Sequence, residues 1–107
     1  MDDKTFDALV AKLWRRLTDA IDTIDPDVVE ATATPDIVTL EIAGGKEVVV
    51  NTQRAVHQVW VAAQGHGLHF DWDPVRESFW DDKGQGLELL AFLAGVLRDE
   101  TGVDLHF

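Results

Sequence analysis

The chain has 107 residues and a net charge of −11, with 20 Asp or Glu residues against nine Lys or Arg residues. This length fits a single domain over residues 1–107, and the negative charge argues against binding to nucleic acid or to an anionic membrane. The absence of cysteine excludes disulfides, thiolate metal sites and cysteine nucleophiles. We find no signal peptide and no apolar run of membrane-spanning length, and therefore expect a cytoplasmic protein.

The N-terminal segment has the apolar spacing of an amphipathic helix. Apolar residues recur at steps of three and four from Phe6 to Ile24, which predicts a helix that ends near Asp25, because Pro26 fits badly into a continuing helix. Trp14 lies at the edge of the apolar stripe, where we expect it to be partly buried.

An acidic run follows the four basic residues of this predicted helix, Lys4, Lys12, Arg15 and Arg16. No Lys or Arg occurs between Leu17 and Gly45. Asp19 and Asp22 lie opposite the apolar stripe, close to a helix C-terminus that disfavours negative charge. The run contains seven acidic residues: Asp19, Asp22, Asp25, Asp27, Glu30, Asp36 and Glu41. Such a one-sided block is a local field that attracts cations and basic protein surfaces.

From Val28 the apolar period shortens to two, which is typical of strands. Turn signals at Pro35-Asp36, Gly44-Gly45 and Gly65 separate the successive segments. The predicted strands are residues 28–34, 37–42, 47–51, 57–63, 68–72 and 77–80.

The chain closes with a second predicted helix over residues 87–101. Gly102 is the expected stop, and Leu105 and Phe107 are expected to cover the edge of the core. The order of helix, sequential strands and helix predicts an α+β fold, a two-layer α–β sandwich. Both helices should pack on one face of a roughly six-stranded antiparallel sheet, leaving the other face open to water.

The predicted strand 57–63 places an aromatic side chain on that open face. Its apolar side should meet the helices, so Trp60 and Gln58 point to solvent, near Asn51 and Gln53 at the end of the preceding strand. A large aromatic side chain flanked by amides is typical of a protein-binding patch. The alternative is that Trp60 only covers its cross-strand neighbours.

These segments resemble the frataxin family, in particular its bacterial, CyaY-type members, over nearly the whole chain. The most specific part is the run His57-Gln58-Val59-Trp60-Val61-Ala62. It is accompanied by an acidic first helix and first strand, the Asn51-x-Gln53 step, Gly67-Leu68-His69-Phe70-Asp71 and a closing helix with Leu89-Leu90.

The resemblance implies a non-enzymatic, iron-binding regulator or chaperone of iron–sulfur cluster assembly, monomeric without metal. It also implies docking on a cysteine desulfurase and its scaffold protein. It maps the family's metal-binding acidic ridge to Asp19, Asp22, Asp25, Asp27 and Glu30. It maps the family's exposed sheet tryptophan to Trp60, with Asn51, Gln53 and Gln58 as the partner-binding residues beside it.

Two positions depart from the family pattern. Strand one is apolar at Val28 and Val29, where bacterial relatives often carry carboxylates, so we expect a low iron capacity. Trp80 follows Phe79 in strand six, slightly later than the family's tryptophan, which leaves the register of that strand open.

Carboxylate oxygens are hard ligands that suit Fe²⁺ and Fe³⁺, but residues on one surface cannot enclose an ion. We therefore expect weak, water-rich and unselective binding. Three alternatives stay open: a solvated acidic face, a metal-independent adaptor that docks on a basic partner, and, ranked lower, a ferroxidase or iron store. The four histidines form no known metal motif and are interpreted as surface or packing residues: His57, His66, His69 and His106.

Overall fold

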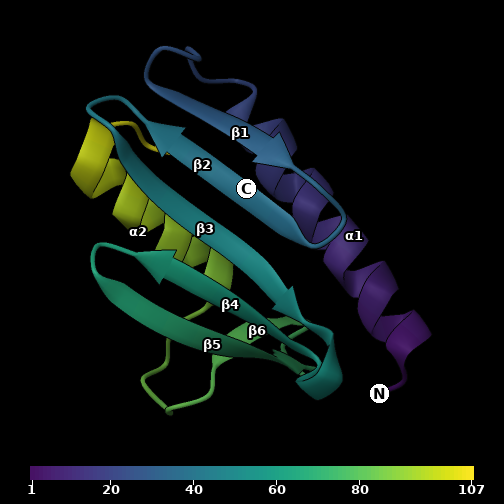
Figure 1. The fold of residues 1–107 in the computed structure, drawn as a ribbon. Coiled ribbons are helices and arrows are strands. Elements are labelled where there is room, and N and C mark those ends of the chain that lie inside the picture. Colours follow the sequence, from purple (N-terminus) through teal and green to yellow (C-terminus); the bar gives the residue numbers. More distant parts are fainter.

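The computed structural model describes all residues from 1 to 107 and has two layers (Figure 1). Helices α1 (Asp3–Ile21) and α2 (Leu89–Thr101) lie on the same face of a six-stranded antiparallel sheet. The strands are β1 (Val29–Ala33), β2 (Ile37–Ile42), β3 (Lys46–Gln53), β4 (Gln58–Ala63), β5 (His66–Asp73) and β6 (Ser78–Asp81). Their order in the sheet is their order in the chain, which confirms the predicted α+β meander. Neither helix combines the length and the apolar character needed to cross a membrane.

Helix α1 ends at Ile21, which corrects the predicted end near Asp25. The N–H groups of Thr23 and Ile24 bond to carbonyls three residues earlier, at 3.2 and 2.9 Å, instead of four residues earlier. The Thr23 hydroxyl also donates to the Ala20 carbonyl at 2.7 Å. These bonds tighten the last turn, so the chain leaves the helix before it reaches its proline.

Two predicted strand starts shift for a backbone reason. Strand β4 begins at Gln58 because a short 3₁₀ turn, η1 (Arg54–Val56), precedes it and His57 adopts a left-handed conformation with φ 51°. Strand β6 begins at Ser78 because Glu77 has φ 52°. A left-handed residue cannot continue a strand.

Helix α2 is capped at both ends. The Glu88 carboxylate accepts a hydrogen bond from the N–H of Leu90 at 2.7 Å, so the helix begins two residues later than predicted. Gly102 ends it in a left-handed conformation with φ 74°, and its N–H bonds to the Arg98 carbonyl. The predicted glycine stop is confirmed.

The core lies between the sheet and the helices. On β2 the side chains of Val38 and Leu40 are fully buried, and on β4 those of Val59 and Val61 are buried in the same way. No charged or polar residue is buried, so no charge requires compensation inside the protein. This alternation confirms the prediction that the apolar side of the strand that carries Val59 and Val61 meets the helices.

The position of Trp14 differs from the predicted edge of the apolar stripe, because the residue is only 7 % exposed and belongs to the core. Its indole N–H donates to the Thr34 carbonyl in the β1–β2 turn at 3.0 Å, which satisfies the polar end of the ring. Leu105 and Phe107 are partly buried against the core, as predicted.

Candidate functional site

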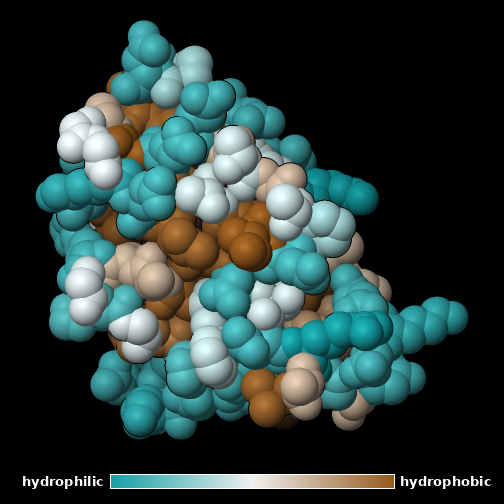
Figure 2. Space-filling view, viewed as in Figure 1, coloured by the Kyte–Doolittle hydropathy of each residue, from teal (hydrophilic) through white to brown (hydrophobic).

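The sheet face opposite the helices carries no other element and faces the viewer in every figure. Figure 2 shows apolar atoms near the middle of this face, surrounded by hydrophilic atoms. Its exposed apolar residues include Ile37, which is 41 % exposed on β2. Strands twist and pair regularly here, so the face presents cross-strand rows of side chains.

Trp60 lies in one such row, on β4 between Asn51 of β3 and His69 of β5. Its indole stacks flat on the His69 imidazole, with ring centroids 4.0 Å apart and an interplanar angle of 10°. The indole is half-buried, neither sealed in the core nor free in solvent. It covers a cross-strand neighbour and still presents ring surface outward.

The polar edge of the indole belongs to a hydrogen-bonded group. Its Nε1 donates to Gln58 Oε1 at 2.9 Å. Gln58 Nε2 in turn donates to Asp71 at 3.0 Å and to Asp82 at 3.2 Å. The second carboxylate also lies 3.6 Å from Nδ1 of His69, which closes the ring of contacts back to the stacked imidazole.

The four predicted partner-binding residues come together on β3 and β4. Asn51 is the cross-strand partner of Trp60, and Gln53 is the cross-strand partner of Gln58. We call these residues (Asn51, Gln53, Gln58 and Trp60) the Trp60 patch. The structure establishes their proximity, and the partner that they bind stays a prediction.

Sequence reasoning missed the supporting residues His69, Asp71 and Asp82. The tight turn after Ala63 pairs that residue with His66, and counting outward from this pair places His69 opposite Trp60. Hairpin register was therefore a usable signal for β5. No local sequence pattern indicates that Asp82, in the loop after β6, contacts Gln58 and His69.

Trp80 extends the open face toward β6. It lies opposite Asp71, its indole N–H donates to the Ser78 hydroxyl at 2.7 Å, and the Arg76 guanidinium sits 3.8 Å above its ring. A guanidinium at that distance makes a cation–π contact. The structure thereby settles the register of the last strand, with Phe79 inward and Trp80 outward.

The segment that precedes β4 is clamped to the first two turns of α1. The Arg54 guanidinium bonds to both carboxylate oxygens of Asp7, at 3.0 and 2.8 Å, and His57 Nε2 lies 2.8 Å from Asp3. The hydrogen bond to His57 and then the charge of Arg54 lower the pKa of Asp3 below its ordinary value. This clamp fixes the residues immediately before Gln58.

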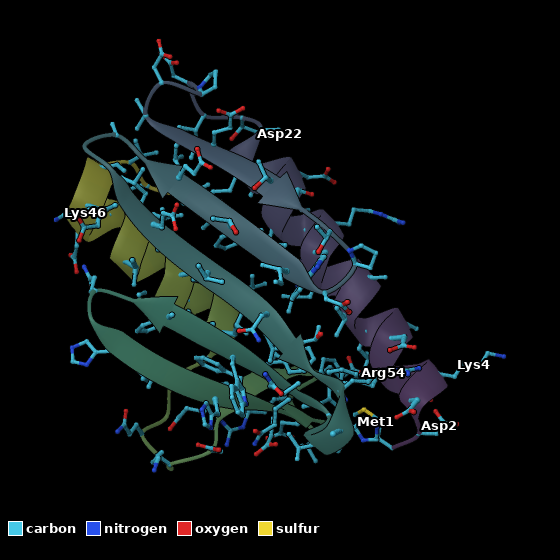
Figure 3. All side chains as sticks on the ribbon, in the orientation of Figure 1. Met1, Asp2, Lys4, Asp22, Lys46 and Arg54 are labelled. Atoms are coloured by element: carbon cyan, nitrogen blue, oxygen red, sulfur yellow. The ribbon has the colours of Figure 1, made fainter.

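The predicted metal-binding residues follow the border of the molecule from α1 to β1, and Asp22 is labelled there in Figure 3. We call them the acidic ridge: Asp19 in the last turn of α1, Asp22 at its C-cap, Asp25 and Asp27 in the connection, and Glu30 on β1. All are exposed, and none makes an ion pair. Within the connection, Asp25 accepts a hydrogen bond from the N–H of Asp27 at 2.9 Å.

The ridge continues onto the open face through two residues outside the predicted site. Glu41 on β2 pairs with Glu30, and Glu47 on β3 pairs with Glu41. No three His, Asp or Glu side chains gather closely enough to hold a metal ion. The ridge therefore fits a cation only as an open surface in which few protein oxygens reach any one ion.

Comparison with known proteins gives a consistent result. Residues 1–103 match a family model described as a frataxin-like domain. The chain is 33 % identical over 102 residues to the iron-sulfur cluster assembly protein CyaY of Tolumonas auensis, covering 95 % of this chain and 94 % of the relative. It is 36 % identical over 109 residues to the protein of the same name from Cupriavidus metallidurans, covering 98 % and 95 %.

A solved structure of frataxin from Psychromonas ingrahamii is similar to this fold, with a TM-score of 0.88 and 26 % sequence identity. The match covers 98 % of this chain and 96 % of that one. The similarity therefore includes both helices and the whole sheet.

Proposed function

This chain belongs to the frataxin family, and we propose that it regulates iron–sulfur cluster assembly as an iron-binding protein that docks on the cysteine desulfurase–scaffold complex. The observation that carries the proposal is the presence of two surfaces that are separated only by β2. The acidic ridge runs along the β1 border, and the Trp60 patch occupies β3 and β4 of the open face.

The acidic ridge supplies the charge for both metal and partner. Its carboxylates have no cationic partner within the chain, so their field is available to an external cation or to a basic protein surface. Hard oxygen ligands suit Fe²⁺ and Fe³⁺, and an open arrangement leaves most of the ion's coordination to water. We therefore propose weak iron binding, and electrostatic steering toward a basic region of the desulfurase.

The Trp60 patch supplies the contact surface. Aromatic side chains dominate the affinity of protein interfaces, especially where the surrounding residues exclude water. Here a half-buried indole lies on the open face beside amide side chains, and its orientation is held by a hydrogen bond to Gln58 and by stacking on His69. We propose that the desulfurase–scaffold complex packs on this face, and that this protein has a binding role with no catalytic residue.

The deciding experiment measures binding to the desulfurase–scaffold complex and sulfide production, each with and without Fe²⁺. We compare wild type with Trp60→Ala and with Val75→Ala, which truncates a loop residue that is 90 % exposed. Loss of an interface hot spot of about 2 kcal/mol or more weakens binding about thirty-fold or more, so Trp60→Ala should show this loss. Loss of the stacked ring should lower its melting temperature by only a few degrees, so the protein stays folded. Normal binding by Trp60→Ala would exclude this face as the docking surface.

The same assay separates the proposal from a metal-independent adaptor. If iron acts through the ridge, Fe²⁺ should change binding or sulfide production in wild type. If the protein binds and regulates equally with and without Fe²⁺, it is an adaptor that docks through the attraction between its acidic ridge and a basic partner surface.

A further inference from the structure

We propose that Gln58 is a positioning residue: it holds the Trp60 indole in its docking orientation and donates no hydrogen bond to the partner. This inference rests on the proposed docking function of the open face. It changes the role of Gln58 from a contact residue to a support for its neighbour.

The donors and acceptors of this group allow one arrangement. Asp71 and Asp82 as carboxylates can only accept hydrogen bonds, so the Gln58 amide must point its NH₂ group at them. The amide oxygen then necessarily faces the other way, toward the Trp60 N–H, to which it is bonded at 2.9 Å. The two carboxylates thus decide the orientation of the amide, and the amide decides the orientation of the indole.

Stacking fixes the remaining freedom of the ring. The indole lies parallel to the His69 imidazole within 10°, and a flip of the ring would carry its N–H away from Gln58. Asp82 contacts both Gln58 and the His69 imidazole, so one carboxylate supports the amide and the stacked ring together. The indole is therefore set in place before any partner arrives.

This arrangement limits what the partner can use. The indole N–H, both Nε2 hydrogens of Gln58 and one face of the Trp60 ring are already engaged within the chain. The partner therefore meets the exposed part of the Trp60 ring through an apolar or π contact, and does not accept a hydrogen bond from the indole. Holding one side chain in its bound rotamer lowers the entropy cost of association.

The test replaces Gln58 with Met, which has a similar length and cannot make these hydrogen bonds. Two quantities are measured: the Trp60 indole ¹H–¹⁵N resonance, assigned by its absence in Trp60→Phe, and the affinity for the desulfurase–scaffold complex. Gln58→Met should shift that resonance upfield, accelerate its hydrogen exchange with water and weaken binding about three- to ten-fold. Gln85→Met makes the same change on an exposed loop residue and should alter neither quantity.

A rescue variant separates positioning from general damage to the sheet. Gln58→Glu alone places a third carboxylate beside Asp71 and Asp82 and should also loosen the indole. Adding Asp71→Asn and Asp82→Asn rebuilds the group with donors and acceptors exchanged, because the new carboxylate accepts from both amides and from the indole. The triple variant should recover the wild-type indole resonance and most of the affinity.

The outcomes distinguish this inference from the proposed function. An unchanged indole resonance in Gln58→Met overturns the positioning role, and so does a shifted resonance with wild-type affinity. In both cases the docking proposal stands if Trp60→Ala binds weakly. If Trp60→Ala binds normally, the docking proposal fails, whatever Gln58 does to the resonance.

Discussion

Glu41 of β2 lies directly opposite Glu47 of β3, and both carboxylates project from the open face of the sheet. Glu30 of β1 faces Glu41 from the other side, so three like charges stand in one cross-strand row. None of the three makes an ion pair. Like charges in directly opposed positions destabilise a sheet, so this row keeps a negative surface at a cost in stability.

We therefore expect Glu41→Gln to stabilise the protein. Removing the central charge should raise the free energy of unfolding by about 0.5–1 kcal/mol and the melting temperature by a few degrees. Urea and thermal unfolding measure both quantities. Repeating them near 1 M salt is the control, because screening should shrink the gain. A loss of stability would mean that Glu41 has a favourable interaction that outweighs the repulsion.

Trp14 should matter for stability and leave docking unchanged. Trp14→Phe removes the hydrogen bond to the Thr34 carbonyl and part of a ring that is 7 % exposed. The free energy of unfolding should fall by about 1–3 kcal/mol, while affinity for the desulfurase–scaffold complex stays near wild type. Trp60→Ala should instead weaken binding far more than it lowers stability. Equal stability of Trp14→Phe and wild type would show that the bond to the turn contributes nothing net.

The order of elements could be predicted because the apolar pattern itself changes. The period of the first helix gives way to a period of two at Val28, and alternation around Val59 is enough to point Trp60 away from the helices. Each of these inferences uses only residues a few positions apart. Side-chain parity on a strand is fixed by geometry, so the open face followed from the sequence.

The missed features depend on contacts between distant segments. The buried Trp14 bonds to a carbonyl twenty residues later, and the support of Gln58 includes Asp82, twenty-four residues away. The left-handed conformation of His57 could not be predicted from the local sequence either, because this conformation is usually marked by a glycine and His57 is not one. Periodicity cannot report such contacts.

Asp81 should contribute to the pH dependence of the protein's folding stability. Its carboxylate accepts hydrogen bonds from the backbone N–H groups of Leu87 at 2.8 Å, Gln85 at 2.9 Å and Lys83 at 3.2 Å. The bonds from Gln85 and then Leu87 lower the pKa of Asp81 in the folded state. A lowered folded pKa gives stability that is present above the unfolded value, about 4, and is lost as the pH falls through the folded value.

Asp81→Asn should therefore lower the melting temperature by several degrees at neutral pH and flatten the loss of stability below about pH 4. Urea unfolding at a series of pH values measures the difference between the two proteins. Asp104→Asn is the matched control, since its carboxylate is exposed and pairs only with Arg98. Parallel curves for wild type and Asp81→Asn would show that the loop bonds do not favour the ionised form.

Iron binding at the acidic ridge is tested with Fe²⁺ under anaerobic conditions. Titration should shift or broaden amide NMR signals of residues 19–30 in a saturable way, because exposed carboxylates attract a hard cation. Replacing Asp19, Asp22 and Asp25 with Asn should remove most of this effect. The same titration with Ca²⁺ should perturb the same residues, since an open site has little geometric selectivity.

The control variant removes three exposed charges elsewhere, through Glu77→Gln, Asp99→Asn and Asp104→Asn. It has the same net charge as the ridge variant, so loss of binding in both would mean that iron responds only to total charge. Retained binding in the control and loss in the ridge variant would place the ion on the ridge. If wild type shows no saturable change, the ridge does not bind iron, and its unpaired carboxylates are left with the docking role alone.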